Sequence, residues 1–249
     1  MKAFLLAAGK GTRLRPYTDS LPKCLIPIHG KPLLEIWIDL LKAHGIDRVL
    51  INTHHHAEQV EQAVARLSVR KAVDITTVFE PVLLGSGGTI LENRDFIGGG
   101  EDFLIAYADN LTDINLSAMA AFHNAQKVNG KVLTMGLFRT PTPVACGIAT
   151  LDSNHTITGF KEKPKNPESD LANAGIYMAT YTILKKCREI QRQVREKVFD
   201  FGFHVLPRLV GRMSGYEIKE YLTDIGTVSS YQRALEQWPR RSRETQDGL

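Results

Sequence analysis

The stretch that decides the fold lies at the N-terminus and reads AFLLAAGKGTR (residues 3–13). The continuous apolar run 3–8 predicts a strand that is buried on both faces, as in a parallel sheet. Glycine carries no Cβ, so Gly9 and Gly11 allow the backbone to approach a ligand closely and to direct its N–H groups at anionic oxygens. The stretch therefore predicts a phosphate-binding loop at the end of a buried strand.

The alternation of short apolar strands and helices continues from there to about residue 110. We expect a three-layer, doubly wound, Rossmann-like α/β fold with a mixed sheet. The expected strands are 3–8, 48–52, 73–79 and 103–106, and the expected helices are 33–43, 57–67 and 87–93.

The pattern changes after residue 110, where shorter pieces of strand and helix mix. We expect helices at 116–126 and 205–210, and strands at 131–137, 147–150, 156–160, 173–179 and 216–221. This half is expected to form a wall over the site of the first half. No boundary between separate domains is evident, so we predict one domain over 1–238, followed by a polar, basic tail at 239–249.

Composition limits the classes of partner. Of the 249 residues 43% are hydrophobic, and the net charge of +4 is scattered, which suits anionic small molecules better than nucleic acid. Three cysteines without metal-like spacing favour a reducing, cytoplasmic setting. The run 3–8 is shorter than the ~7–15 apolar residues of a signal peptide, and no segment approaches the ~20 of a membrane span. We expect no membrane partner, and homo-oligomerisation stays open.

Three ordinary explanations compete for the glycine loop. A dinucleotide fingerprint needs a third glycine where Leu14 stands, and a Walker A loop needs a different spacing with a following Lys-Ser/Thr. A plain strand-to-helix turn remains. Against that plain turn stand Arg13 and Lys23, two cations on a segment expected to be stiff and extended, which suits a triphosphate cradle. The stiffness comes from Pro16, Pro22, Pro27 and Pro32.

The continuation GKGTRLRPYTDSLPKCLIPIHGKPLLE (residues 9–35) closely resembles the signature of the sugar-1-phosphate nucleotidyltransferases. That family includes glucose-1-phosphate thymidylyltransferase and mannose-1-phosphate guanylyltransferase. The resemblance recurs in order to about residue 235. It implies an enzyme that transfers a nucleotidyl group from a nucleoside triphosphate to a sugar 1-phosphate, with Mg²⁺ as cofactor and pyrophosphate as by-product. Residues 1–115 would then bind mainly the nucleotide and 116–238 mainly the sugar.

The resemblance implies roles for residues on the nucleotide side. Arg13 would hold the leaving pyrophosphate, and Lys23 would hold phosphates near the reacting centre. Glu80 and Gly85 would meet the base edge. The implied nucleotide-binding set is Ala7, Ala8, Gly9, Gly11, Thr12, Arg13, Glu80, Gly85 and Asn110.

Residues on the sugar side follow from the same resemblance. Glu162 would accept hydrogen bonds from sugar hydroxyls, and Lys163 would hold the attacking phosphate. Gly147 and Asn173 would touch the sugar. The catalytic set is therefore Arg13, Lys23 and Lys163.

Asp109 and Asp224 match the metal-binding aspartates of the family. Asp109 also stands directly after an apolar strand, where ligands of open α/β sheets gather. Asp224 could instead cap the helix that follows, although Thr227 could fill that role. Two carboxylates suit Mg²⁺, which completes its shell with phosphate oxygens and water.

The base is argued from Glu80. An ionised carboxylate only accepts, and guanine offers the adjacent donors N1–H and N2–H₂, whereas uracil and thymine are better served by an amide. This favours GTP, with mannose or heptose 1-phosphate as the sugar. A UTP- or dTTP-using transferase stays open, as does a non-catalytic relative that binds a nucleotide sugar. A nicotinamide-dependent dehydrogenase is disfavoured by Leu14.

Two further clusters are given structural roles. The adjacent His54, His55 and His56 point in different directions, so we expect surface histidines rather than a metal site. The alternating Phe199, Phe201 and Phe203 are expected to pack in the core or in an interface.

Overall fold

Strand β1 (Lys2–Leu6) lies inside the main sheet of the structure, a computed structural model that describes residues 1–239, and has parallel neighbours on both sides. The side chains of Phe4 and Leu5 are both fully buried but belong to different hydrophobic clusters, one on each face of the sheet. This confirms the strand predicted from the run 3–8. The parallel strands are β1 (Lys2–Leu6), β4 (Arg48–Thr53), β5 (Asp74–Phe79) and β6 (Phe103–Tyr107).

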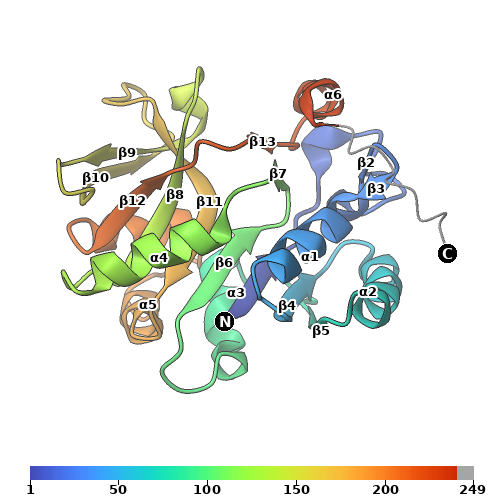
Figure 1. Ribbon diagram of the computed structural model, residues 1–249, viewed down its shortest axis with the longest axis horizontal. Coiled ribbons are helices and arrows are strands. Elements are labelled where there is room, and N and C mark those ends of the chain that lie inside the picture. Colours follow the sequence, from blue (N-terminus) through green and yellow to red (C-terminus); the bar gives the residue numbers. More distant parts are fainter. Residues whose placement is uncertain (240–249) are drawn as a thin grey trace, which may run out of the picture.

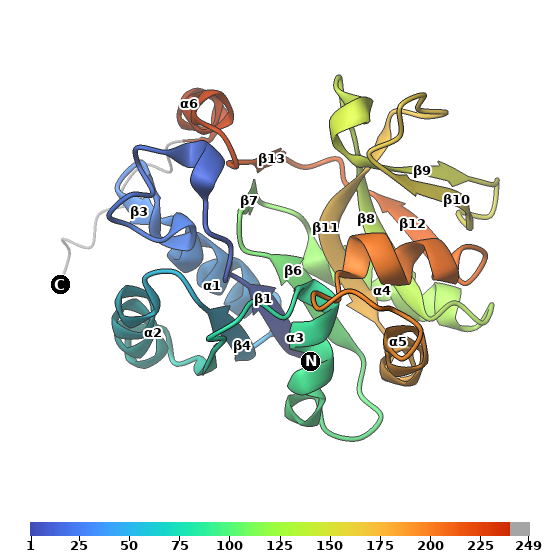
Figure 2. The ribbon, with the colours of Figure 1, turned by 180° about the vertical axis from the view of Figure 1, so that it is seen from behind.

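Helices cover both faces of this sheet, which confirms the three-layer α/β fold. Helices α1 (Leu33–Ala43), α2 (Ala57–Lys71) and α4 (Leu116–Lys127) bury their apolar residues in one cluster. Helices α3 (Ser86–Glu92) and α5 (Ile183–Gln191) bury theirs in the other. Figure 1 looks onto α1 and α4, and Figure 2, seen from behind, looks onto α3 and α5.

The second half extends the same sheet mainly by antiparallel pairing, with one further parallel pair, so the nine-stranded sheet is mixed. Strand β11 (Leu171–Ala179) pairs with β6 and joins the two halves. Its register against β8 shifts between Asn173 and Tyr177, where Gly175 has a φ of 66°. The other strands are β8 (Leu133–Arg139), β9 (Gly147–Leu151), β10 (Ile157–Glu162) and β12 (Met213–Glu217).

Two small ribbons lie outside the main sheet. Strands β7 (Asn110–Thr112) and β13 (Leu222–Asp224) pair antiparallel, with Asp224 opposite Asn110. Strands β2 (Pro27–Ile28) and β3 (Lys31–Pro32) form a hairpin before α1. Helix α6 (Val228–Gln237) follows β13, and Thr227 caps its first turn. The β7–β13 ribbon therefore brings the residues around 109 and 224 together. The N-cap of α6 is Thr227 and not Asp224.

The structure differs from the expected elements at several points. The proline-rich segment is not extended: it winds through two 3-10 turns, Thr12–Leu14 and Lys23–Leu25, tightened by a hydrogen bond from the Thr18 hydroxyl to the Gly11 carbonyl. The strand expected at 216–221 is β12, which begins at the fully buried Met213 and ends at Glu217. Helix α5 was not predicted.

Three other expectations concern the helix at 205–210, membrane-spanning segments and the C-terminal tail. A π-turn over Phe201–Val205 and a 3-10 turn over Leu206–Leu209 replace the helix expected at 205–210. No helix in residues 1–239 is both long and apolar enough to cross a lipid bilayer. Residues 240–249 of the expected basic tail lie outside the described residues.

One buried polar contact between α4 and the sheet gives the stability a pH dependence. His123 is 1% exposed and its Nδ1 pairs with the Thr134 hydroxyl, whereas its Nε2 has no hydrogen-bond partner within the described chain and lies 3.9 Å from Asp102 Oδ2. Burial lowers the pKa of His123 to about 4, although Asp102 partly opposes the shift. The charged imidazolium is therefore disfavoured in the folded protein.

We predict that the free energy of unfolding falls as the pH drops from about 6.5 to about 4. In that window the unfolded chain binds a proton at His123 that the folded chain does not, which removes at most about 3 kcal/mol. Urea unfolding at pH 7 and pH 4.5 should show a smaller fall for His123→Gln than for the wild type. An equal fall in both proteins would contradict the role of His123.

Candidate active site

Two neighbouring cavities open at the carboxyl ends of the parallel strands. The first has a volume of about 230 Å³ and lies between the glycine loop and the loop after β5. The second has a volume of about 360 Å³ and lies beside the antiparallel half of the sheet. Tyr107, Asp109 and Asp200 line both cavities. A ligand with two parts can therefore place one in each cavity and its centre near Asp109.

The glycine loop bends tightly out of β1. The Ala7 N–H donates to the Asn52 side chain at 2.8 Å, which ties the loop to β4. Gly11 has a φ of 63°, and a Cβ there would lie 2.8 Å from the Thr18 Cγ2 atom. The structure places Ala7, Ala8 and Gly9 on the wall of the first cavity, with Gly11 and Thr12 in the turn that follows. Arg13, at the end of that turn, lines the second cavity.

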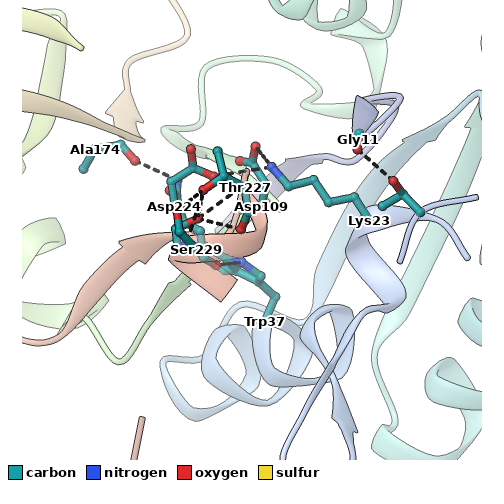
Figure 3. A network of polar contacts seen from close by, with 11 residues as sticks. Gly11, Lys23, Trp37, Asp109, Ala174, Asp224, Thr227 and Ser229 are labelled. Carbon is teal, nitrogen blue, oxygen red and sulfur yellow. Dashed lines mark hydrogen bonds and ion pairs between the residues drawn. The ribbon is translucent and has the colours of Figure 1, made fainter. Parts of the chain in front are cut away.

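Lys23 joins the two candidate metal aspartates (Figure 3). Its Nζ lies 2.6 Å from Asp109 Oδ2 and 3.4 Å from Asp224 Oδ1. Burial opposes the charged form of Lys23, but the two carboxylates outweigh burial and raise the pKa of the ammonium group. Burial also raises the pKa of Asp224, the nearby Asp109 adds to the rise, and Lys23 opposes it. The site is thus a compact set of one cation and two anions.

The donor set suits a hard divalent cation held partly by its substrates. The side chains of Asp109 and Asp224 are 38% and 52% exposed, so each keeps carboxylate oxygen accessible from the cavities. No group of three or more histidine, cysteine, aspartate or glutamate side chains in residues 1–239 is arranged for a metal. Two carboxylates alone match Mg²⁺, which takes its remaining ligands from phosphate and water.

Hydrogen bonds to Glu80 connect the loop after β5 to β4 and to α3. Glu80 is 4% exposed, and its Oε1 accepts from Asn52 Nδ2 at 2.9 Å and from the Thr89 hydroxyl at 2.5 Å. Its Oε2 accepts from the Leu84 N–H at 3.1 Å. With two lone pairs on each oxygen, only Oε2 keeps a free one. A bidentate contact of Glu80 with guanine is therefore not available in this geometry.

Gly85 and its neighbours complete the wall of the first cavity. Gly85 has a φ of 82°, and a Cβ there would lie 2.7 Å from the carbonyl oxygen of Phe199. The same carbonyl accepts from the Gly88 N–H at 2.9 Å. Only glycine fits this close approach, so the main chain of the loop faces the cavity directly.

The second cavity gathers the residues expected to bind the sugar. Gly147 lies against Glu162: a Cβ there would be 2.5 Å from Glu162 Oε2. Burial raises the pKa of Glu162, with Lys163 opposing and Asp200 adding to the rise. Lys163 holds a strained φ of 47°, and its N–H donates to the Cys146 carbonyl at 3.0 Å. Strain of this kind in a non-glycine residue is typical of functional sites.

Asn173 and Asn110 are both tied into the bulged part of β11. The Asn173 Oδ1 accepts from the Gly175 N–H at 2.9 Å, and its Nδ2 donates to the Tyr177 hydroxyl at 2.7 Å. The Asn110 Nδ2 donates to the Ala174 carbonyl at 2.8 Å. Both asparagines line the second cavity. Asn110, expected on the nucleotide side, thus lies with the sugar-side residues.

Sequence reasoning missed several residues of the two cavities. One of them, Asn52, could have been found from the sequence, because it is a polar residue at the end of a predicted buried strand. Ser86 donates to Asp200 Oδ2 at 3.0 Å, and this pair links the loop after β5 to the segment around 200. The expectation for Phe203 is packing in the core or in an interface; the ring is outside the core, 55% exposed, and lines the second cavity, unlike the buried Phe199 and Phe201.

Comparisons with known proteins show the family and the fold of the chain. The nucleotidyl transferase family model matches residues 2–240. The UTP–glucose-1-phosphate uridylyltransferase of Synechocystis is 32% identical over 94% of this chain, and this chain spans 62% of that relative. A Bacillus anthracis structure, provisionally assigned as a glucose-1-phosphate thymidylyltransferase, has a TM-score of 0.83 at 24% identity and covers all of this chain and 98% of its own.

A second solved structure carries a nucleotide analogue. HddC from Yersinia pseudotuberculosis, complexed with GMP-PN, has a TM-score of 0.76 at 21% identity over 96% of this chain and 99% of its own. The structural likenesses establish the fold, and the family match covers nearly the whole sequence. The chain belongs to the nucleotidyl transferase family.

Proposed function

We propose that this protein transfers a nucleotidyl group from a nucleoside triphosphate to a sugar 1-phosphate, giving a nucleotide sugar and pyrophosphate. The observation that carries the proposal is the pair of adjacent cavities that meet at Asp109. The first has a glycine-rich wall and Lys23, which suits a nucleotide. The second has Glu162 and Lys163, which suit a sugar and its phosphate. The family match supports the same reaction.

The reaction is an in-line displacement at the α-phosphorus. An oxygen of the sugar phosphate forms the new P–O bond, and the bond from the α-phosphorus to the β-bridging oxygen breaks, so that pyrophosphate leaves with the electron pair. A sugar phosphate is already largely ionised at neutral pH. The protein therefore needs no strong general base, and its task is to position the two phosphates and to offset their charge.

Three cations divide this task. Lys23, whose pKa is raised by its two carboxylate neighbours, stays charged at the junction of the cavities. Lys163 lies in the second cavity, where it can hold the attacking phosphate. Arg13 reaches the same junction from the glycine loop and is assigned to the leaving pyrophosphate. Their positive charges lower the repulsion between the two anionic substrates.

Asp109 and Asp224 would hold Mg²⁺. When bound, the ion supplies positive charge to the phosphate oxygens at the reacting centre. The side chains themselves orient the site, because each carboxylate also accepts a hydrogen bond from Lys23.

We propose GTP as the nucleotide and mannose or heptose 1-phosphate as the sugar. Glu80 Oε2 keeps one lone pair beside the first cavity, and this acceptor can meet one of the two donors of guanine, N1–H or N2–H₂. The GMP-PN complex of the structurally similar HddC is consistent with a guanine nucleotide in this fold. The alternative is UTP or dTTP, since the Synechocystis relative is a UTP-dependent enzyme by name.

A non-catalytic protein that only holds a nucleotide sugar is the second candidate. It is disfavoured because Arg13, Lys23, Lys163 and both aspartates converge on one junction. A binding protein has no need of three cations around the reacting phosphates.

A thermal-shift screen of ATP, CTP, GTP, UTP and dTTP tests the proposal. With Mg²⁺ present, we expect GTP to raise the melting temperature most, because a ligand that binds only the folded state stabilises it. Asp109→Asn should lose the part of the shift that depends on Mg²⁺, whereas the exposed Asp95→Asn should behave as the wild type. A dominant shift with UTP or dTTP would overturn the choice of base. No shift with any triphosphate would overturn the function.

Arg13→Ala should lower turnover by about 10²- to 10³-fold in a pyrophosphate-release assay, because it removes a charge aimed at the leaving group. The fold should persist, since Arg13 is exposed. Arg15→Ala is the matched control: Arg15 lies two residues away, is 63% exposed and pairs with Asp19. Equal rates for the two variants would exclude Arg13 from the reacting centre.

A further inference from the structure

Phe203 is an apolar ring left open at a polar cavity. Its side chain is 55% exposed, whereas Phe199 and Phe201, four and two residues earlier, are 3% and 1% exposed. Single exposed apolar residues are common and need no explanation. Phe203, however, lines the second cavity together with Glu162 and Lys163. Aromatic walls with a few converging polar groups are typical of small-molecule sites.

The segment that carries Phe203 is held rigidly. Asp200 Oδ1 accepts from the Phe203 N–H at 2.9 Å, and the Asp200 N–H donates to His204 Nδ1 at 2.9 Å. The Phe201 N–H donates to the Ser86 hydroxyl at 2.8 Å, which anchors the turn to α3. The ring is therefore displayed by a fixed π-turn, and such turns are frequent at functional sites.

The turn also brings Phe203 next to the sugar-side polar groups. A Cβ at Gly202 would lie 3.4 Å from Glu162 Oε2, so the backbone before Phe203 runs beside that carboxylate. Lys163 Nζ lies 5.9 Å from the centre of the Phe203 ring. An acceptor, a cation and an aromatic face thus meet at one end of the cavity.

A sugar ring matches this combination of groups. Its hydroxyls lie mainly around the rim, whereas its C–H bonds leave apolar patches on the faces. A C–H group carries partial positive charge, and the face of an aromatic ring carries partial negative charge, so the two attract in addition to their apolar contact.

We propose that Phe203 is a specificity-determining residue whose ring packs against a C–H face of the sugar, while Glu162 accepts hydrogen bonds from its hydroxyls. This inference rests on the proposed function and deepens it. The substrate class is a pyranose 1-phosphate that presents one face free of axial hydroxyls to the ring.

The present contact of the ring with Lys163 does not explain its exposure. At 5.9 Å the ammonium group lies at the outer limit of a cation–π contact, and both partners are open to solvent on the cavity side. A phosphate group attracts Lys163 more strongly than the ring does. The ring face then remains available to the sugar of the same ligand.

The test measures KM for the sugar 1-phosphate and for the nucleotide separately in the wild type, Phe203→Ala and Phe203→Tyr. We expect Phe203→Ala to raise KM for the sugar 1-phosphate about tenfold, equivalent to about 1.4 kcal/mol. KM for the nucleotide should not change, and Phe203→Tyr should keep the wild-type values because it keeps the ring face. Tyr181→Ala is the matched control, since Tyr181 is a partly exposed aromatic residue (38%) on the turn before α5.

The outcomes separate this inference from the proposed function. If none of the sugar 1-phosphates tested makes the wild type release pyrophosphate, the proposed function itself fails. If the wild type turns over and Phe203→Ala leaves both KM values unchanged, only the role of Phe203 fails. A lower kcat with an unchanged KM would indicate that Phe203 acts by positioning Lys163 and not by contacting the sugar. That result would also overturn the proposal. Nucleotide-induced thermal shifts equal to those of the wild type verify that the Phe203→Ala protein is folded.

Discussion

The ion triad of Lys23, Asp109 and Asp224 is the constraint on which the site depends. The three residues come from the glycine-loop segment, the end of β6 and the end of β13, so one ammonium group connects segments that are 86 and 201 residues apart. Two carboxylates brought together without a cation would repel, and one of them would take up a proton. Lys23 offsets that repulsion and fixes where the two cavities meet.

The bulge in β11 carries this arrangement into the second half of the chain. Gly175 can adopt its φ of 66° and approach Tyr107 closely, since a Cβ there would lie 2.5 Å from Tyr107 Cδ2. The bulge leaves the Ala174 carbonyl free to accept from Asn110, which follows Asp109 directly. The candidate metal aspartate is thereby connected to β11 through one peptide bond and one hydrogen bond.

The sequence was sufficient for features with a strong local signal. The buried strand 3–8 and the helix 33–43 follow from hydrophobic periodicity, and the glycine loop follows from Gly9 and Gly11. The β7–β13 ribbon has no such signal, because its strands are three residues each and are stabilised by pairing across the chain. The exposure of Phe203 was also hidden, since Phe199, Phe201 and Phe203 look alike until the π-turn rotates one of them outward. Likewise the residue type of Glu80 predicted that its carboxylate accepts hydrogen bonds. It did not predict that Asn52, Thr89 and Leu84 donate to three of its four lone pairs.

Glu80 in the first cavity and Glu162 in the second differ in how they interact with the rest of the protein. This difference bears on which contacts with the substrates can change by substitution. Glu80 is buried and accepts three internal hydrogen bonds, so a substitution there leaves buried donors without partners, which costs folding stability. Burial raises the pKa of Glu162, Lys163 and Asp200 act on this carboxyl group through their charges, and Phe203 is exposed. Substitutions at Glu162 and Phe203 therefore disturb the fold less than those at Glu80. We infer that the proposed sugar contacts of Glu162 and Phe203 can change more readily than the proposed base contact of Glu80.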